Sequence, residues 1–137
     1  MQTLVYYSTS RAPMKKNRPV HLDLRLIKLP LPGFVSILHR VSGLLLFLAL
    51  PLFLRMLQYS LFSIETYTQL VAVLRYPLNK LILISLLWAF LHHFCAGIRY
   101  LAIDMHIGVG LAQARASSKW VLFVSLGLTL LIGIWLW

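Results

Sequence analysis

Three stretches of the chain are long and apolar enough to cross a membrane. They cover residues 34–54, 81–98 and 120–137, and Arg40 is the one Lys, Arg, Asp or Glu inside them. The hydrocarbon core of a bilayer is about 30 Å thick, which roughly 20 helical residues span. Because an unpaired backbone amide in lipid costs several kcal/mol, each stretch is predicted to be a helix. The pattern therefore predicts an all-α membrane protein with three transmembrane helices.

The remaining residues divide the chain into two parts. Residues 1–32 are predicted to be a cytoplasmic N-terminal segment with an interfacial stretch, because leucines alternate with charged side chains ahead of two prolines. Residues 33–137 are predicted to be a three-helix transmembrane domain with spans at about 34–56, 79–101 and 118–137. Residues 59–77 and 104–119 are expected to be the connectors between these spans.

Composition and charge exclude an ordinary soluble domain. Of 137 residues, 60% are apolar, and a globular domain of this size would expose large apolar patches. Thirteen Lys and Arg residues outnumber three acidic ones, giving a net charge of +10. Basic side chains cluster ahead of the first span, so the positive-inside rule predicts a cytoplasmic N-terminus and a C-terminus outside. A nucleic-acid partner would need a folded basic face, so none is expected.

The cysteine content and the N-terminal residues bear on cofactor and location. Cys95 is the single cysteine, which excludes an internal disulfide. No C-x-x-C-H motif occurs, so any haem would be held without covalent attachment. The N-terminal residues lack the apolar run of a secretory signal and fit a transit peptide only weakly. A multi-pass protein of the bacterial inner membrane is therefore expected.

A histidine pair lies deep in the second span. His93 has Ala89 and Gly97 one turn away on either side, so small residues leave a groove that could admit a flat macrocycle. Imidazole is the commonest metal ligand, but this side chain could equally form a hydrogen bond across helices. His92 has the bulkier Trp88 near it, and helix packing is the favoured interpretation there. Since no second histidine lies at the depth of His93, a second haem ligand would come from another chain.

Ser36, His39 and Arg40 occupy positions i, i+3 and i+4 near the start of the first span, which places them on one helix face. Together they offer a hydroxyl, a titratable ring and a fixed cation near one membrane depth. Such a set could bind a carboxylate, for example a haem propionate, or the polar oxygen of a quinone headgroup. Arg40 alone would also serve as an ordinary positive-inside anchor.

Other polar residues of the spans are expected to be structural. Arg99 and Asp104 are predicted to form an ion pair at the cytoplasmic end of the second span. Ser125, Thr129 and Gly133 form a stripe of small residues that is typical of helix packing. Three helices make a poor closed bundle, so a further membrane subunit is expected as a partner.

Three motifs of the chain together resemble a known family. RPVHLDL (residues 18–24), SILHRVSG (36–43) and HHFCAGIRYLAID (92–104) resemble the cytochrome b membrane-anchor subunit of bacterial succinate dehydrogenase, respiratory complex II. The resemblance runs from Arg18 to the C-terminus and includes the layout of three spans. Tyr100 departs from it, since many relatives carry histidine directly after GIR.

The resemblance implies a non-catalytic subunit of a succinate:quinone oxidoreductase. It implies haem b as cofactor and quinone as substrate, with a flavoprotein, an iron–sulfur subunit and a second hydrophobic anchor subunit as partners in the lipid membrane. Electrons would pass from succinate to quinone in the respiratory chain and the tricarboxylic acid cycle. By the same resemblance His93 is one axial ligand of the haem iron, and the second anchor subunit supplies the other. His39 and Arg40 would contact the haem propionates, and Ser36 and Arg40 would border the quinone.

Two other functions remain open from the residues alone. A haem-free structural anchor of a related quinone oxidoreductase would dock peripheral subunits through its basic cytoplasmic face. A small ion or proton transporter would use His93 and Asp104 as a relay, but no inverted repeat or broken helix supports it. A reduced-minus-oxidised spectrum separates the haem-binding subunit from the haem-free anchor.

Overall fold

The computed structural model describes residues 29–136, and all regular structure within that range is helical. The chain forms α1 (Leu31–Phe62), α2 (Ile64–Leu74), α3 (Pro77–Asp104) and α4 (Leu111–Leu136). Helices α1, α3 and α4 are each long and apolar enough to cross a membrane. The prediction of an all-α membrane protein with three transmembrane helices is therefore confirmed. The predicted N-terminal segment, residues 1–32, lies almost entirely outside the described residues.

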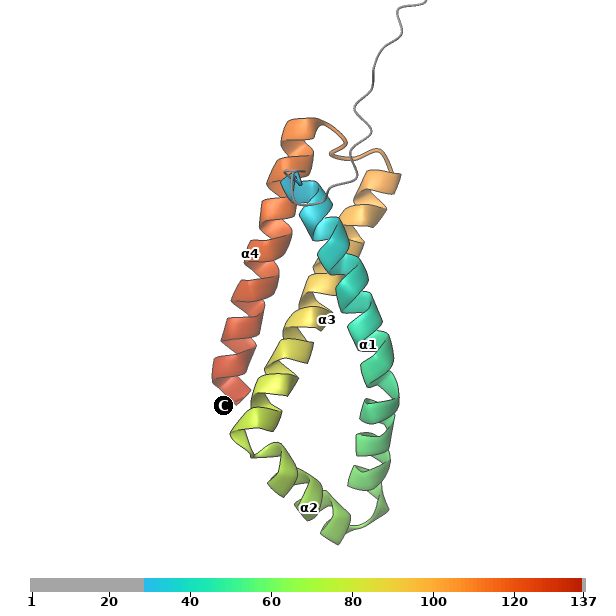
Figure 1. Cartoon of the computed structure of the whole chain (residues 1–137), viewed down its shortest axis with the longest axis vertical. Coiled ribbons are helices and arrows are strands. Elements are labelled where there is room, and N and C mark those ends of the chain that lie inside the picture. The colour runs from blue at the N-terminus through green and yellow to red at the C-terminus, as the bar shows by residue number, and fades with distance from the viewer. Residues whose placement is uncertain (1–28, 137) are drawn as a thin grey trace, which may run out of the picture.

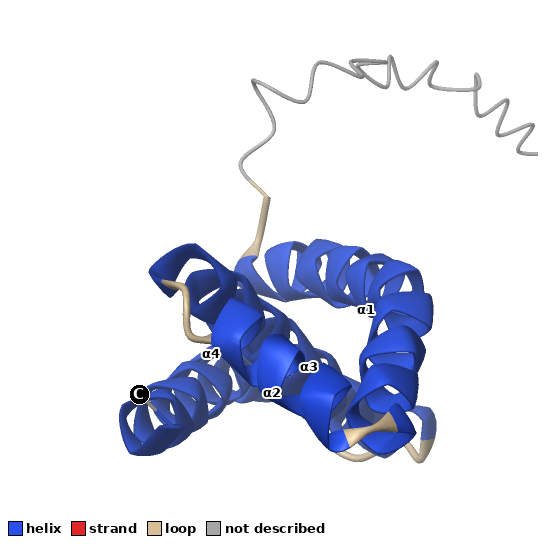
Figure 2. Ribbon diagram, turned by 90° about the horizontal axis from the view of Figure 1, so that it is seen from below, coloured by secondary structure: helices blue, strands red, loops and turns tan. Residues whose placement is uncertain are grey.

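Helix α3 is the centre of the bundle and packs against both α1 and α4 (Figure 1). Helix α1 crosses α3 in the upper half of Figure 1. The two helices contact each other through His39 of α1 and His93 of α3. Below this crossing the two helices diverge, and α2 connects them at the bottom of the view (Figure 1). Figure 2 shows the bundle from the α2 end and makes clear that every regular element in the described range is a helix.

Prolines set the start of α1 but do not interrupt it. Pro30 has extended backbone and precedes the helix, while Pro32 lies in the first turn, where an amide hydrogen would have no helical partner. Pro51 lies inside the helix, which continues through it to Phe62. With 32 residues α1 is about 48 Å long, which exceeds the thickness of a hydrocarbon core. Helix α1 therefore either tilts in the bilayer or extends beyond its core.

Helix α2 lies in a region that the sequence pattern predicts as a connector. Ser63 has extended backbone and ends α1, and its hydroxyl accepts a hydrogen bond from the Thr66 amide at 3.1 Å. The Thr66 hydroxyl oxygen accepts in return from the Ser63 amide at 3.1 Å. This reciprocal capping starts α2 directly after α1. With 11 residues, α2 is too short to span the core and serves as a link between two spans.

Helix α4 begins at Leu111, earlier than the predicted start of the third span near residue 118. The turn before it contains His106, with φ 62°, and Gly108, with φ 75°. Both are left-handed backbone conformations, which glycine adopts without steric cost. This turn reverses the chain, so α4 runs back antiparallel to α3 (Figure 1), and Arg99 near the end of α3 reaches the first turns of α4.

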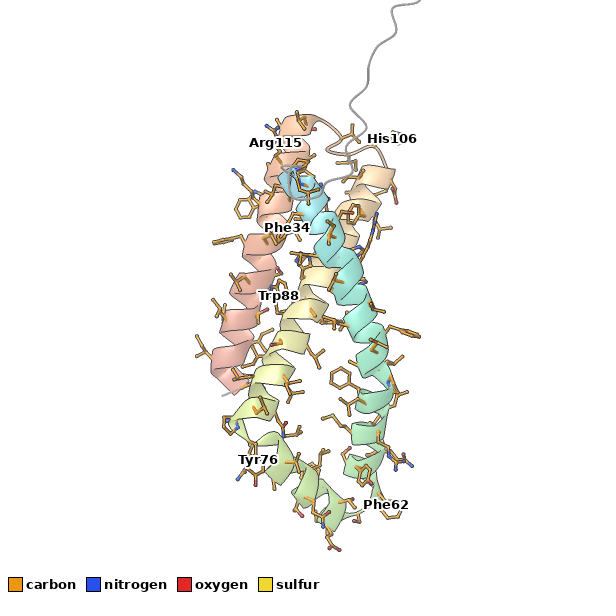
Figure 3. All side chains as sticks on the ribbon, viewed as in Figure 1. Phe34, Phe62, Tyr76, Trp88, His106 and Arg115 are labelled. Carbon is orange, nitrogen blue, oxygen red and sulfur yellow. The ribbon has the colours of Figure 1, made fainter. Side chains whose placement is uncertain are left out.

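Most of the buried residues in the described range are small, and His92 and Arg99 are the large exceptions. The small ones include, from α1, α3 and α4 in turn, Ser42, Ala49, Ala89, Ala96, Ser118, Val121 and Ser125. Small residues allow helix backbones to approach closely in a membrane. The stripe of Ser125, Thr129 and Gly133 is buried, which confirms its predicted role in packing. Large apolar side chains instead cover the outside of the long helices (Figure 3), as expected of surfaces that face lipid or a membrane partner.

Candidate functional site

The His93 ring on α3 is turned toward α1. Its Nδ1 atom lies 3.1 Å from the His39 carbonyl oxygen and 3.3 Å from the Ser42 hydroxyl oxygen. The Ser42 hydroxyl donates its hydrogen to the same carbonyl at 2.9 Å. We refer to His39, Ser42, Gly43 and His93 as the histidine site. Its two sides come from helices that are far apart in the sequence, since Ser42 and His93 are separated by 51 positions.

The surroundings of the His93 ring decide which nitrogen carries its hydrogen. A carbonyl oxygen only accepts hydrogen bonds, so the ring nitrogen that faces it must donate. We therefore assign the hydrogen to Nδ1, which donates to the His39 carbonyl. In the neutral ring Nε2 then keeps its lone pair. No hydrogen bond to this nitrogen is formed within residues 29–136, so the Nε2 lone pair is not used by the described part of the chain.

Two aromatic contacts surround the His39 ring. It stacks on His93 with a centroid distance of 4.2 Å and an angle of 12° between the ring planes. Tyr100 contacts it at 5.2 Å with the planes tilted by 45°. Tyr100 is the position at which the sequence departs from the family pattern, and here its ring packs against the histidine site. Its hydroxyl is buried without a hydrogen-bond partner among the described residues.

Gly43 brings α1 close to the His93 ring. A Cβ atom at position 43 would lie 2.8 Å from Cε1 and 3.2 Å from Nδ1 of that ring. Gly97 is more open, because a Cβ atom there would have only the Nε2 atom of His39 within 4 Å, at 3.8 Å. Ala89, which the sequence places beside a groove, is 2% exposed. The space beside the histidine site is therefore at Gly97, while Ala89 and Gly43 are tightly packed.

His92 has a different environment from its neighbour. Its ring is fully buried and stacks on Trp88 at 5.4 Å, and neither ring nitrogen has a hydrogen-bond partner in the described part of the chain. Successive residues of an α-helix point about 100° apart, so His92 and His93 meet different neighbours. The interpretation of His92 as a packing residue is confirmed. Because protein atoms enclose it, His92 is not accessible to an external ligand.

Ser36 and Arg40 lie one turn apart on α1, next to the histidine site. Ser36 is half-buried and Arg40 is exposed. Neither side chain forms a hydrogen bond or an ion pair with another residue in the range 29–136. Helix α1 is regular through the whole SILHRVSG motif, so the face predicted from the spacing is present. The Ser36 hydroxyl and the Arg40 guanidinium are therefore available to a ligand or a partner residue.

The Arg99 side chain binds α4 and does not reach Asp104. Its Nε donates to the Ser117 hydroxyl at 2.9 Å, and an Nη nitrogen donates to the Ala114 carbonyl at 3.3 Å. Its guanidinium also lies 5.2 Å from the centre of the Tyr100 ring. Asp104 is exposed, and no ion pair joins it to Arg99 in this structure of residues 29–136. Five residues along a helix rotate a side chain by about 140°, which puts Asp104 on another face than the predicted partner.

Sequence reasoning missed Ser42, Gly43 and Ser117 as contributors to these contacts. Ser42 and Gly43 belong to the SILHRVSG motif, and their spacing of i+3 and i+4 from His39 was an available signal that they share its helix face. No comparable signal links Ser117 to Arg99. That contact depends on the turn between α3 and α4, which brings the two helices side by side.

The residues of the histidine site fit a haem, which would be held through the imidazole of His93. Metal-binding histidines usually donate their other ring N–H to a carbonyl, a carboxylate or water, which fixes the tautomer and the ring orientation. His93 shows this arrangement with the His39 carbonyl at 3.1 Å. The described residues contain no group of three or more His, Cys, Asp or Glu that could hold a bare metal ion. A single oriented imidazole suits a cofactor that brings most of its own ligands, as a porphyrin does.

The fold and the site define a class of protein: a helical, multi-pass membrane protein with an oriented imidazole between two of its spans. Residues 14–132 match the family model described as succinate dehydrogenase/fumarate reductase transmembrane subunit. The match covers well over half of the chain, and the chain belongs to this family. The family expected from three short motifs is thus confirmed.

Several curated proteins are similar to this chain over most of its length. The succinate dehydrogenase cytochrome b556 subunit of Coxiella burnetii is 37% identical over 125 residues, which cover 90% of this chain and 100% of that protein. The cytochrome b556 subunit of Paracoccus denitrificans is 32% identical over 103 residues, covering 75% and 79%. The mitochondrial cytochrome b560 subunit of Dictyostelium discoideum is 29% identical over 112 residues, covering 78% of this chain and 56% of that protein.

Proposed function

We propose that this chain is the haem b-binding membrane anchor of a succinate dehydrogenase complex. The observation that carries the proposal is the His93 ring, whose Nδ1 donates to the His39 carbonyl at 3.1 Å while Nε2 stays free. Family membership supports the proposal, because the similar curated proteins are named cytochrome b subunits. His93 would ligate the haem iron through Nε2. A histidine of a second membrane-anchor subunit would be the other axial ligand.

When bound, a haem b would supply one-electron transfer. The task of this chain's residues is to hold and orient that group. The His39 carbonyl keeps the hydrogen on Nδ1 of His93, and ring stacking at 4.2 Å limits rotation of the imidazole. His39 and Arg40 are adjacent on α1 and are proposed to contact the haem propionates.

Ser36 and Arg40 are proposed to border the site at which quinone is reduced. The Ser36 hydroxyl can donate a hydrogen bond to a quinone oxygen, and Arg40 follows it by one helical turn. The guanidinium has a fixed positive charge, which in a site that excludes water stabilises the negative charge that quinone gains with electrons. Arg40 is exposed, so a ligand that diffuses within the membrane can reach it.

The proposed complex also contains a flavoprotein that oxidises succinate and an iron–sulfur subunit that carries electrons to the membrane. The N-terminus and the turn between α3 and α4 are proposed to be cytoplasmic, where Arg115 and Lys119 add positive charge. In that orientation Ser36 and Arg40 lie toward the side on which the peripheral subunits dock. The exposed apolar side chains of the spans would face lipid and the second anchor subunit of a bacterial inner membrane.

A reduced-minus-oxidised spectrum of the complex, purified in mild detergent, tests this function. The expected result is a b-type band that is lost in His93→Leu and kept in His92→Leu. His92 is the matched control, because it is the adjacent residue with the same side chain and is buried away from the ligand nitrogen. A wild-type complex with all its subunits but no band would be the haem-free structural anchor instead.

A further inference from the structure

Ser42 lies at the centre of the polar contacts around the His93 ring. Its side chain is 2% exposed and donates to the His39 carbonyl at 2.9 Å. Its oxygen lies 3.3 Å from His93 Nδ1, and the carbonyl lies 3.1 Å from the same nitrogen. Two oxygen atoms of α1 and one nitrogen atom of α3 therefore meet at the crossing of the two helices.

The hydrogens of this cluster have one consistent arrangement. The Ser42 hydroxyl has a single hydrogen, and the His39 carbonyl, which can only accept, takes it. The lone pairs of the Ser42 oxygen then remain for Nδ1 of His93. A lone pair on Nδ1 would meet two oxygen atoms and no hydrogen, whereas a hydrogen on Nδ1 has two acceptors. Ser42 therefore favours the tautomer that leaves the lone pair on Nε2.

The other buried serine and threonine hydroxyls in the described range form bonds only within their own helix. Ser118 and Ser125 of α4 donate to carbonyl oxygens of α4 at 2.7 Å and 3.2 Å. Of the buried hydroxyls in the described range, Ser42 is the one that also contacts an imidazole nitrogen on another helix. A buried serine with only a packing role satisfies its hydroxyl with one hydrogen bond to a carbonyl of its own helix. The second contact indicates that Ser42 acts on the His93 ring.

We propose that Ser42 is a positioning residue that fixes which ring nitrogen of His93 carries the hydrogen and thereby tunes the haem that His93 binds. The inference rests on the proposed function, because it takes haem iron as the partner of Nε2. Acceptors at the far ring nitrogen draw its hydrogen and make the coordinating nitrogen a stronger electron donor. A stronger donor favours ferric over ferrous iron. Ser42 therefore lowers the reduction potential relative to a site with the His39 carbonyl alone.

The test is an equilibrium redox titration of the purified complex carrying Ser42→Ala or Ser42→Thr. Alanine removes the hydroxyl and leaves the His39 carbonyl, whereas threonine keeps a hydroxyl at the same position. We expect Ser42→Ala to raise the midpoint potential, with a change in the ferric/ferrous ratio of up to about tenfold, which is about 59 mV for one electron. Ser42→Thr should keep the wild-type potential.

Ser85→Ala is the matched control, because Ser85 is exposed on α3 and donates to a carbonyl of its own helix. The ferric electron paramagnetic resonance spectrum is a second readout, since it responds to the strength and orientation of the axial imidazole. Loss of haem in Ser42→Ala but not in Ser42→Thr would also support the proposal.

An unchanged potential and spectrum in Ser42→Ala would overturn the role of Ser42 and leave His93 as the ligand. The role of Ser42 would also be overturned if the shift in potential or the loss of haem in Ser42→Ala were equally large in Ser42→Thr or in Ser85→Ala. A wild-type complex without haem is a different outcome. It would overturn the proposed function, and this inference with it.

Discussion

Replacing Gly43 by alanine should push the His93 ring away from α1 and weaken haem binding. The added Cβ atom would lie 2.8 Å from Cε1 of His93 and 3.2 Å from Nδ1. Carbon atoms in van der Waals contact are separated by about 3.5–4.0 Å, so the ring or the helix must move. Overpacking of this kind costs about 1–3 kcal/mol. A displaced ring would also lengthen the hydrogen bond from Nδ1 to the His39 carbonyl.

Gly127→Ala is the matched control for this substitution. Gly127 also lies within a long helix, α4, but nothing lies within 4 Å of a Cβ atom built there. Alanine in a helix interior is favoured over glycine by about 0.5–1 kcal/mol, and both variants gain this amount. The difference in free energy of unfolding between Gly43→Ala and Gly127→Ala therefore isolates the steric cost, which is about 1–3 kcal/mol.

The assay is unfolding of the purified complex by increasing SDS in mixed micelles, followed by circular dichroism and by the haem band. Gly43→Ala should unfold at a lower SDS fraction than Gly127→Ala and should show an altered or lost haem band. Gly127→Ala should match the wild type or exceed it. Equal stability of the two variants, with a normal haem band in Gly43→Ala, would refute the close approach of α1 to the His93 ring.

Further substitutions separate the roles of the other polar residues in the spans. His92→Leu should keep the haem band and lower the free energy of unfolding by at most about 1 kcal/mol, because it removes two buried ring nitrogens that have no hydrogen-bond partner in the described range. Arg99→Gln should destabilise by about 2–3 kcal/mol through loss of its bonds to α4, while Asp104→Asn should stay within about 0.5 kcal/mol of the wild type. Equal losses in those two variants would instead favour the predicted ion pair. Arg40→Leu should lower quinone reductase activity with the haem still bound, whereas Arg55→Leu, which removes another exposed arginine of α1, should not. Normal quinone turnover in Arg40→Leu would remove Arg40 from the site.

The three long helices could be predicted because lipid leaves an apolar segment few alternatives to a helix. Their ends could not be predicted in the same way. Helix α4 starts at Leu111, although the apolar run begins only near Trp120. The length of an apolar run reflects the thickness of the hydrocarbon core, and a helix can continue into water beyond it. Span predictions are therefore minimum lengths for the helices.

Helix α2 and the partner of Arg99 depend on features with weak or no local signal. The capping box that starts α2 has Thr66 where glutamate or glutamine is the usual residue, so the motif is easily missed. Arg99 could be assigned to Asp104 from closeness in sequence, but the turn before α4 brings Ser117 and Ala114 to the guanidinium instead. Contacts that a turn creates between helices are not encoded in the spacing of either helix.

In the candidate site too, features set within one helix could be predicted, whereas contacts between two helices could not. The common face of Ser36, His39 and Arg40 could be predicted, because spacing within one helix determines it. The small neighbours of His93 favoured it over His92 as a candidate ligand, although Ala89 proves to be buried and only Gly97 leaves space. The residues of α1 that touch the His93 ring could not be predicted, because these contacts depend on the crossing angle and register of two helices.

The contact between the His39 carbonyl and His93 depends on a local property of α1. In an α-helix the carbonyl of residue i accepts the amide hydrogen of residue i+4, and the side chains at i+3 and i+4 lie on the same face as residue i. For His39 these positions are Ser42 and Gly43. Gly43 has no Cβ atom to block the ring, and Ser42 adds a second oxygen beside the carbonyl. A bulky residue at either position would cover the acceptor, which is why substitutions at 42 and 43 are expected to change the environment of the His93 ring, 51 and 50 positions away.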